Sequence, residues 1–518
     1  MRKQYLKVHS YIEPLQLQNV MESTEKTIYI TESGDGIKAS VDAEVTGNSE
    51  KSNAELKCCF EPLKAADLGD KSFMETYGTK YAYYGGAMAN GISSPEMVIE
   101  LAKRGFMGSL GTGGISLDVV EGWIDKIQAE VDKGYLVNFL SSPGMSDHEL
   151  NTVKLFLKKK IHAIEASAFI EMTSALVYYR LAGLKKGKGN SVICENHIIA
   201  KISRNEVAQK FMSPPPVRIV KELLGSGLIT EEQASLSQSI PMADDITVEA
   251  DSGGHTDNRP LVSLLPDIIA LAKRIQKEKH YSPKIRIGAG GGISTPESAL
   301  AAFSMGAAYV VTGSVNQSCL EAGTSDYVKK MLSETEMQDV VMAPCADMFE
   351  MGTCVQVIKK GTMYPMNAQR LYNMYCSYNS ISEIPEKQLE SIEKRMFHSS
   401  VDDVWNSTKE FFAKRDPSVV VRAEKNEKQK MALIFRWYLG NSSRWAITGD
   451  KSRLMDMQIW CGQSMGAFNN CVKGTKLEKV ENRKVADIAD FIMKGAAYCF
   501  NINFMKMNGM KLDCRYTV

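Results

Sequence analysis

The sequence predicts an α/β fold: a (β/α)8 TIM barrel with a helical insertion and a C-terminal, mainly helical substrate-binding domain. Between residues 75 and 315, eight short apolar or β-branched runs alternate with segments long enough for helices, which is typical of βα units around a parallel sheet. Each run ends in glycine or polar residues, as barrel strands do where they carry functional loops. Beyond residue 340 the alternation gives way to helical periodicity. An open doubly wound sheet is the alternative.

The elements follow in order. Residues 1–70 are an accessory N-terminal segment, polar and turn-rich around one expected strand at 27–30. The barrel is expected over residues 71–340, with a helical insertion at about 205–240 behind three consecutive prolines. Its strands are expected at 81–86, 106–111, 135–140, 163–169, 197–203, 245–250, 284–290 and 309–314. Residues 341–518 are expected to form a mainly helical region, with helices at 385–397, 401–415, 429–439 and 485–500.

Composition and charge exclude several classes of protein. Among 518 residues, 44% are hydrophobic and 24% charged, and the formal net charge of +1 provides no global field for nucleic acid or an anionic membrane. No apolar run approaches the roughly 20 residues that span a bilayer, and the basic N-terminus lacks the apolar core of a signal peptide. The eleven cysteines form no CxxC pair or zinc spacing, which favours reduced thiols, a cytoplasmic location and no metal site.

A glycine-rich loop predicts an anion site. In GAGGGISTPE, residues 288–297, Gly290, Gly291 and Gly292 let the backbone approach a ligand, and the next helix presents free N–H groups. Gly313 and Ser314 end the following strand, where barrels often complete a phosphate site. A Rossmann fingerprint would want an acidic residue at that strand end, which is absent. A merely structural glycine turn is the other alternative.

A histidine follows a Gly-Gly turn at another strand end. Gly253 and Gly254 precede His255 in EADSGGHTDNRP, residues 249–260. On the face that carries the phosphate loops, this histidine could donate a proton, orient a carbonyl or contact a cofactor. The competing interpretation is a loop-holding histidine that is hydrogen-bonded to Asp257 or Thr256.

The ordered motifs resemble a known family. GGAMANGI, VNF, IIAKIS, EADSGGHTDNRP, GAGGGI and TGS occur in the order seen in FMN-dependent barrels of the nitronate monooxygenase and enoyl reductase superfamily. FMSPPP, MAPCADMFEMG and FRWYLGNSSRWA look like the PfaD-like trans-acting enoyl reductases of polyketide and polyunsaturated fatty acid synthases. The resemblance covers residues 70 to 495 and leaves the N-terminal segment unexplained.

The resemblance implies an FMN-dependent enoyl reductase, an oxidoreductase that acts on CH–CH bonds. With NADPH or NADH, it would reduce the 2,3-double bond of enoyl thioesters during polyketide or fatty acid synthesis. Implied partners are an acyl carrier protein bearing the enoyl chain and polyketide synthase modules, with neither nucleic acid nor membrane, and a homodimer is left open. A nitronate monooxygenase-like FMN oxidase and a non-catalytic carrier-protein docking module are the alternatives.

The resemblance also assigns site residues. His255 would polarise the substrate carbonyl or relay a proton, and Lys201 would lie near the N1/C2 side of the flavin ring, where reduced flavin carries negative charge. The implied cofactor-binding set is Ala87, Met88, Asn138, Lys201, Gly253, Gly254, Gly290, Gly291, Gly292, Gly313 and Ser314. The resemblance makes residues 341–518 the substrate- and carrier-binding region. Its candidate basic residues for an acidic carrier are Lys359, Lys360, Arg370, Arg436 and Arg444, although a solvated or internally paired charge is the more common role for each such residue.

Overall fold

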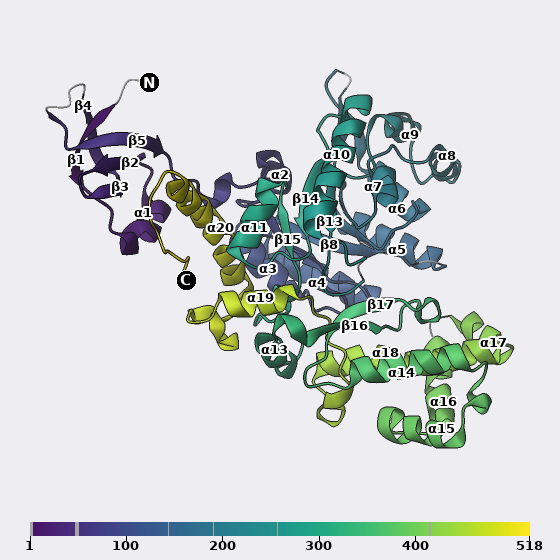
Figure 1. Cartoon of the computed structure of the whole chain (residues 1–518). Helices are drawn as coiled ribbons and strands as arrows, with labels where there is room; N and C mark the ends of the chain where they lie inside the picture. The colour runs from purple at the N-terminus through teal and green to yellow at the C-terminus, as the bar shows by residue number, and fades with distance from the viewer. Residues whose placement is uncertain are drawn as a thin grey trace.

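Eight parallel strands close into a barrel at the centre of the molecule (Figure 1). The computed structural model describes residues 4–46, 51–142, 144–189, 191–255, 257–413 and 416–517. Pairing of Val311 with Tyr84 joins the last strand to the first, so the predicted barrel is confirmed and the open doubly wound sheet is excluded. The strands all lie within the predicted runs: β6 (Tyr83–Gly85), β7 (Met107–Leu110), β8 (Tyr135–Leu140), β9 (Ala163–Ser167), β12 (His197–Ile202), β13 (Asp245–Glu249), β14 (Arg286–Gly290) and β15 (Val310–Thr312).

Helices cover the outside of the barrel, and two of them begin at an N-cap residue followed by proline. Ser94 caps α3 (Pro95–Lys103), and Thr295 caps α11 (Pro296–Ser304). Each side chain accepts a hydrogen bond from a backbone N–H in the first turn, and each helix begins with a proline. The other covering helices are α4 (Leu117–Glu130), α5 (Ser146–Lys158), α6 (Ser174–Ala182) and α10 (Leu261–Lys279). The insertion contributes α7 (Asn205–Phe211), α8 (Val217–Gly225) and α9 (Glu231–Leu236), and a small hairpin, β10 (Leu184–Lys186) with β11 (Val192–Cys194), lies before β12.

Polar side chains fill the barrel interior. Tyr84, Thr247 and Tyr309 form a chain of hydrogen bonds of 3.0 Å each through the Thr247 hydroxyl. Nearer the amino ends of the strands, Arg286 pairs with Asp245 (2.7 Å), which also accepts a hydrogen bond from Tyr77 (2.6 Å) on α2 (Lys71–Tyr77). All of these side chains are buried, so the amino end of the barrel is packed and a ligand site belongs at the carboxyl end.

The N-terminal segment forms a five-stranded antiparallel sheet, so the expectation of one strand is wrong. The order is β3-β2-β5-β1-β4, with α1 (Leu17–Ser23) beside it (Figure 1). The strands are β1 (Tyr5–Ser10), β2 (Ile28–Ser33), β3 (Gly36–Ser40), β4 (Asp42–Thr46) and β5 (Ala54–Phe60). Charged residues on their exposed face mask the apolar alternation, because only one face of this sheet is buried.

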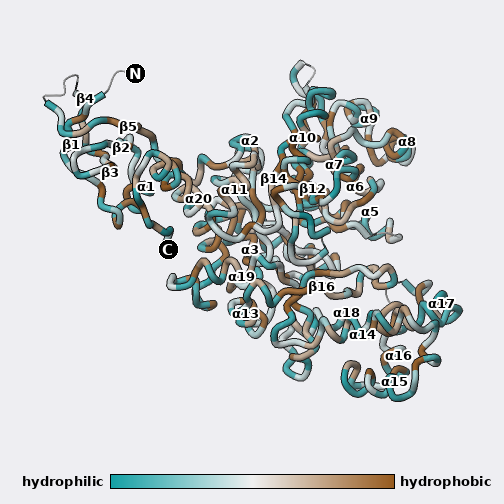
Figure 2. Tube along the Cα trace, in the orientation of Figure 1, coloured by the Kyte–Doolittle hydropathy of each residue, from teal (hydrophilic) through white to brown (hydrophobic). Residues whose placement is uncertain are grey.

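A helical lobe follows the barrel. It contains the two-stranded ribbon β16 (Val340–Pro344) and β17 (Cys354–Ile358), which helical periodicity did not predict, and a hydrophobic core of its own. Figure 2 shows hydrophobic residues along barrel strand β14 and along ribbon strand β16. The helices of the lobe are α14 (Tyr364–Ser377), α15 (Glu386–Ile392), α16 (Val401–Ala413), α17 (Pro417–Glu424) and α18 (Glu427–Thr448). Of these, α15, α16 and α18 overlap predicted helices.

The last helix returns to the barrel. After α13 (Asp326–Ser333), the helical lobe and α19 (Ser464–Cys471), helix α20 (Val485–Met507) packs on α11 and α3 and reaches the N-terminal region. A Cβ added at Gly495 would lie 2.5 Å from Pro296, so α20 approaches α11 closely. No helix in the described ranges is long and apolar enough to cross a membrane. All eleven cysteines are free thiols, as their spacing predicts.

Candidate active site

The predicted phosphate loops lie at the carboxyl ends of β14 and β15. Gly291 and Gly292 follow β14 with φ angles of +85° and +75°, a left-handed backbone that favours glycine. A Cβ added at Gly291 would lie 2.7 Å from the carbonyl carbon of Ala250, whereas added Cβ atoms at Gly292 and Gly313 would meet nothing within 4 Å. The backbone is therefore pressed against the end of β13 at one glycine and leaves room for a ligand beside the other two.

Ser314 links the predicted phosphate loops to a third segment, the residues just before α19. Its Oγ accepts a hydrogen bond of 2.9 Å from the N–H of Gly462, just before α19. A Cβ added at Gly253 would lie 3.0 Å from the same nitrogen and 3.1 Å from Ser314 Oγ. The loops after β13 and β15 thus meet the segment before α19. Gly462 is missing from the predicted site, although the Gly-Gln-Ser start of α19 repeats the signal of a glycine before a helix.

Lys201 lies in a buried network with two carboxylates. Its Nζ is 3.4 Å from Glu165 and 3.2 Å from Glu249, and Glu165 is fully buried. Burial opposes the charged ammonium, but the attraction of Glu249 and Glu165 outweighs that effect and raises the pKa of Lys201. Lys201 is therefore held protonated at neutral pH as a hydrogen-bond donor. Neither glutamate was predicted, although both stand as lone acids inside apolar strand runs.

The same network fixes the loop after β6 and the side chain of Asn138. The N–H of Ala87 donates to Glu165 (3.0 Å), and the N–H of Met88 donates to Ser93 (2.9 Å). Both donors are used within the protein, so ligand contacts from these two residues fall to their carbonyl oxygens and side chains. Asn138 donates to the Glu165 carbonyl (3.1 Å) and to the Ser167 hydroxyl (2.9 Å), which leaves its oxygen to accept.

The loop that carries Gly253 and Gly254 is held by the β16–β17 ribbon. Gln356 on β17 bonds to the Gly254 carbonyl through its backbone N–H (3.4 Å) and to the Asp251 carboxylate through its side chain. Burial raises the pKa of Asp251, and the hydrogen bond from Gln356 partly offsets this. Within the described ranges, Ser252 Oγ and Gln356 Oε1 are buried without hydrogen-bond partners. These two polar atoms, with the open space beside Gly292 and Gly313, are what a site for a polar ligand requires.

His255 has a different partner from the one that sequence suggests. Asp257 bonds to Arg204 and Ser203 instead (2.8 Å each), and Thr256 lies outside the described residues. The Nε2 atom of His255 lies 3.4 Å from the carboxylate of Asp347, in the turn between β16 and β17. This contact lowers the pKa of Asp347. The histidine side chain is 44% exposed, so its imidazole can meet a substrate from solvent.

The predicted residues thus fall into two groups. One group is wholly or partly buried and joined by hydrogen bonds and ion pairs: Ala87, Asn138 and Lys201 with the unpredicted Glu165 and Glu249. Met88 lies beside Ala87 but bonds to Ser93 instead. The other comprises strand-end loops with His255, Gly253, Gly254, Gly290, Gly291, Gly292, Gly313 and Ser314, which meet the ribbon and the start of α19. No direct hydrogen bond or ion pair between His255 and Lys201 occurs in the part of the chain that the structure describes.

Known proteins resemble the chain in both of its large parts. Residues 72–363 match the family model for nitronate monooxygenase, and residues 378–457 match the inserted helical domain of [acyl-carrier-protein] S-malonyltransferase. The chain is 47% identical, over 88% of its length, to a polyunsaturated fatty acid synthase subunit of Thraustochytrium sp. and 44% identical, over 86%, to polyketide biosynthesis protein PksE of Bacillus subtilis. It spans only 31% and 58% of those two relatives.

One solved structure resembles the chain over the whole length of the solved domain. It is the enoyl reductase domain of MlnA from the macrolactin biosynthesis cluster of Bacillus amyloliquefaciens, with a TM-score of 0.82 and 42% identity. The match covers 85% of this chain and 100% of that domain.

Proposed function

The chain belongs to the nitronate monooxygenase family, and from that membership we propose that it is an FMN-dependent, trans-acting enoyl reductase. Its substrates are enoyl thioesters on an acyl carrier protein of a polyketide or fatty acid synthase, and NAD(P)H is the reductant. The observation that carries the proposal is the 42% identity to an enoyl reductase domain over all of that domain, together with open glycine loops at the carboxyl end of the barrel.

The strand-end residues fit FMN. The backbone at Gly291, Gly292 and Gly313, with Ser314, would hold its phosphate, because the loops leave open space beside Gly292 and Gly313. Asn138 and Lys201 would face the ring. When bound, FMN supplies hydride transfer from NAD(P)H to the β-carbon of the enoyl thioester.

The main role of Lys201 is to act as an oriented hydrogen-bond donor, and its positive charge matters less. When Lys201, Glu165 and Glu249 are all ionised, their network carries one net negative charge, so the ammonium is already compensated. Its distances to both carboxylates restrict where the remaining N–H points. We therefore assign Lys201 the task of holding a ring acceptor in a fixed direction, with Glu165 keeping both this ammonium and the Ala87 loop in place.

His255 acts on the thioester. It stands behind the Gly-Gly turn, and its Nε2–H edge faces the Asp347 carboxylate. In the imidazolium form the Nδ1–H is then left to donate to the substrate carbonyl or to pass its proton to the α-carbon. The two actions remain alternatives within the proposal.

Replacement of His255 tests this assignment. His255→Ala should retain FMN, with its yellow absorbance near 450 nm, and lose most turnover of a crotonyl thioester. Full turnover in this variant would remove His255 from the mechanism.

Two competing functions predict different behaviour of the wild-type protein. A nitronate monooxygenase-like oxidase would consume oxygen with nitroalkanes, and the family match over residues 72–363 is the observation in its favour. A non-catalytic docking module would be colourless and would fail to take up FMN. Anaerobic reduction by NAD(P)H followed by reoxidation with a crotonyl-carrier substrate separates both from the enoyl reductase.

A further inference from the structure

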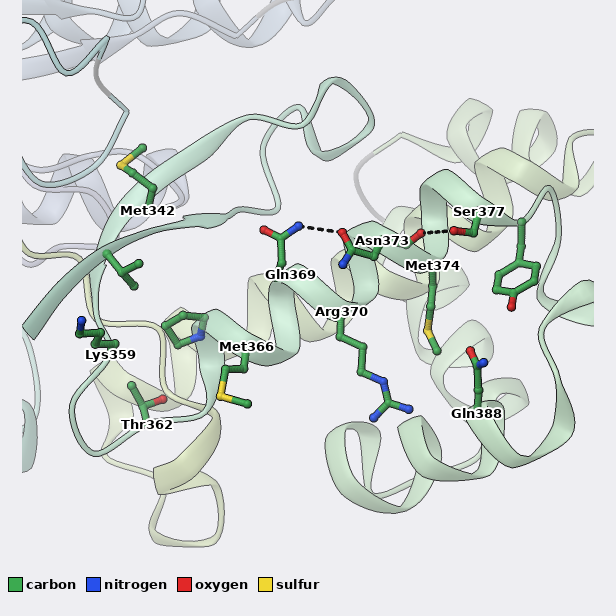
Figure 3. Close-up of a pocket in the computed structure, with 13 residues that line it drawn as sticks. Met342, Lys359, Thr362, Met366, Gln369, Arg370, Asn373, Met374, Ser377 and Gln388 are labelled. Atoms are coloured by element: carbon green, nitrogen blue, oxygen red, sulfur yellow. Dashed lines mark hydrogen bonds between the residues drawn. The ribbon is translucent and has the colours of Figure 1, made fainter.

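A long groove runs along α14 on the helical lobe, away from the strand-end loops. Its volume is about 1130 Å³, and its walls come from α14, the β16–β17 ribbon and α15 (Figure 3). Because α14 has 14 residues, the groove follows a helix of about 20 Å. The lining residues that matter for recognition are Met342, Lys359, Met366, Arg370, Met374 and Tyr378.

The floor of the groove is apolar and adaptable. Met366 and Met374 lie two turns apart on α14, and Met342 adds a third thioether from the ribbon. Met366 is 66% exposed, a large apolar side chain open to solvent. Methionine fits varied partner shapes because its side chain is flexible and polarisable. A surface of this kind suits the apolar face of a partner helix.

Two cations at the groove are uncompensated. Lys359 is exposed, and half-buried Arg370 donates only to the Ser391 hydroxyl (3.2 Å); neither forms an ion pair with any described carboxylate. Two other basic candidates are paired: Lys360 lies 3.7 Å from Asp339 and Arg436 lies 3.2 Å from Glu350. Arg444 on α18 also forms no ion pair with a described carboxylate, but it does not line the groove. The groove therefore combines an apolar floor with two cations that lack an ion-pair partner, which suits an acidic partner.

We propose that this groove docks an acidic, amphipathic helix of the acyl carrier protein. Apolar residues of that helix pack on Met366 and on the partly buried Met342, while its carboxylates pair with Lys359 and Arg370. The β16–β17 ribbon supplies Lys359 at its end, and it also carries Gln356 and the turn with Asp347 that hold the His255 loop. A carrier in the groove thus sits against the element that positions the candidate catalytic histidine. The inference rests on the proposed function.

Charge reversal at the two cations tests the proposal by binding. A Lys359→Glu/Arg370→Glu double variant and a Met366→Asp variant are titrated with crotonyl-loaded acyl carrier protein. Each should bind at least tenfold more weakly than wild type. Raised salt should weaken the wild-type complex and affect the double variant much less, because exposed charge pairs are screened. The matched control is Lys221→Glu/Lys273→Glu on α8 and α10, two exposed lysines outside the groove, which should bind as wild type does.

Turnover distinguishes the docking site from the active site. The double variant should keep wild-type turnover of a crotonyl thioester of N-acetylcysteamine and lose it on the carrier-bound substrate. Equal carrier affinity in wild type and both groove variants, or equal losses on the two substrates, would overturn the docking site. A wild type that binds the carrier through these residues but reduces neither thioester would refute the enoyl reductase function and leave the docking site standing.

Discussion

Replacing Gly313 with alanine tests whether the loop after β15 holds the cofactor phosphate. The residue has a φ of −127°, and an added Cβ would meet nothing within 4 Å. The methyl group therefore displaces no protein atom. We expect the free energy of unfolding of the apoprotein to change by no more than about 1 kcal/mol, because alanine restricts the unfolded chain, which favours folding, while the Gly313 backbone (ψ −78°) lies outside the main allowed regions, which opposes it.

The same methyl group should weaken FMN binding, because it occupies space that we assign to the phosphate. A hydrogen bond to a charged group contributes about 1.5–3 kcal/mol. Losing one backbone contact to the phosphate therefore corresponds to a rise in Kd of about 10- to 150-fold.

Gly291 provides the contrast. Alanine there would adopt φ of +85°, which costs about 1–2 kcal/mol, and its Cβ would overlap the Ala250 carbonyl carbon at 2.7 Å, which adds about 1–3 kcal/mol. Gly291→Ala should thus lower the free energy of unfolding by about 2–5 kcal/mol. FMN loss in Gly291→Ala follows from a damaged fold, whereas in Gly313→Ala it follows from a blocked site.

Urea unfolding of deflavinated protein and titration with FMN, followed by quenching of flavin fluorescence, measure the two effects. Gly122→Ala in helix α4 is the matched control, since its Cβ also meets nothing within 4 Å and should stabilise the helix by about 0.5–1 kcal/mol. FMN affinity of Gly313→Ala within threefold of wild type would refute the phosphate assignment. Destabilisation equal to that of Gly291→Ala would refute the open space beside Gly313.

Three further predictions concern the carboxylates around the site. Glu165→Gln should lower the free energy of unfolding by about 1–3 kcal/mol, because Lys201 loses its fully buried ion-pair partner and keeps only the partly exposed Glu249; unchanged urea unfolding would contradict the network. Asp347→Asn should reduce kcat on crotonyl thioesters with FMN affinity unchanged, and a wild-type kcat would show that Asp347 does not position His255. Hydrogen bonding to Arg204 lowers the pKa of Asp257 to about 2, against about 3.9 when unfolded, so its stabilisation exists above pH 4 and disappears as pH falls towards 2. Thermal unfolding of wild type and Asp257→Asn should therefore converge in that window, and a constant difference would exclude the ion pair as its cause.

The barrel could be predicted because its signals are local. Runs such as 284–290 are rich in apolar residues, end at glycine, and are followed by a capped helix, here α11 with Thr295 as its cap. The N-terminal sheet lacks that contrast: β4 has only partly buried or exposed residues, and β5 mixes lysine with cysteine. A half-exposed antiparallel strand of this kind resembles a polar loop when read alone.

The candidate site divides in the same way. The glycine loops are visible as motifs, because the residues that shape each turn are neighbours in sequence. The contacts of Lys201 with Glu165 and Glu249 depend on the register in which β12 pairs with β9 and with β13. That register decides which side chains of the three strands are neighbours inside the barrel. The partner of His255 lies 92 residues further along the chain, and no local rule selects Asp347 over the neighbouring Asp257.

Helix α20 has a consequence for how the protein is made. It packs against α11, the helix that follows the phosphate loop, and its Asn501 side chain bonds to the backbone of Leu63 next to the N-terminal sheet. On the ribosome, both of those partners emerge long before α20 is synthesised. The surface of α11 that α20 covers is therefore exposed to solvent while the helical lobe is translated. The carboxyl end of the barrel, from which α11 follows, is therefore expected to mature only late in synthesis, and chaperones would meet this protein with the face of α11 exposed.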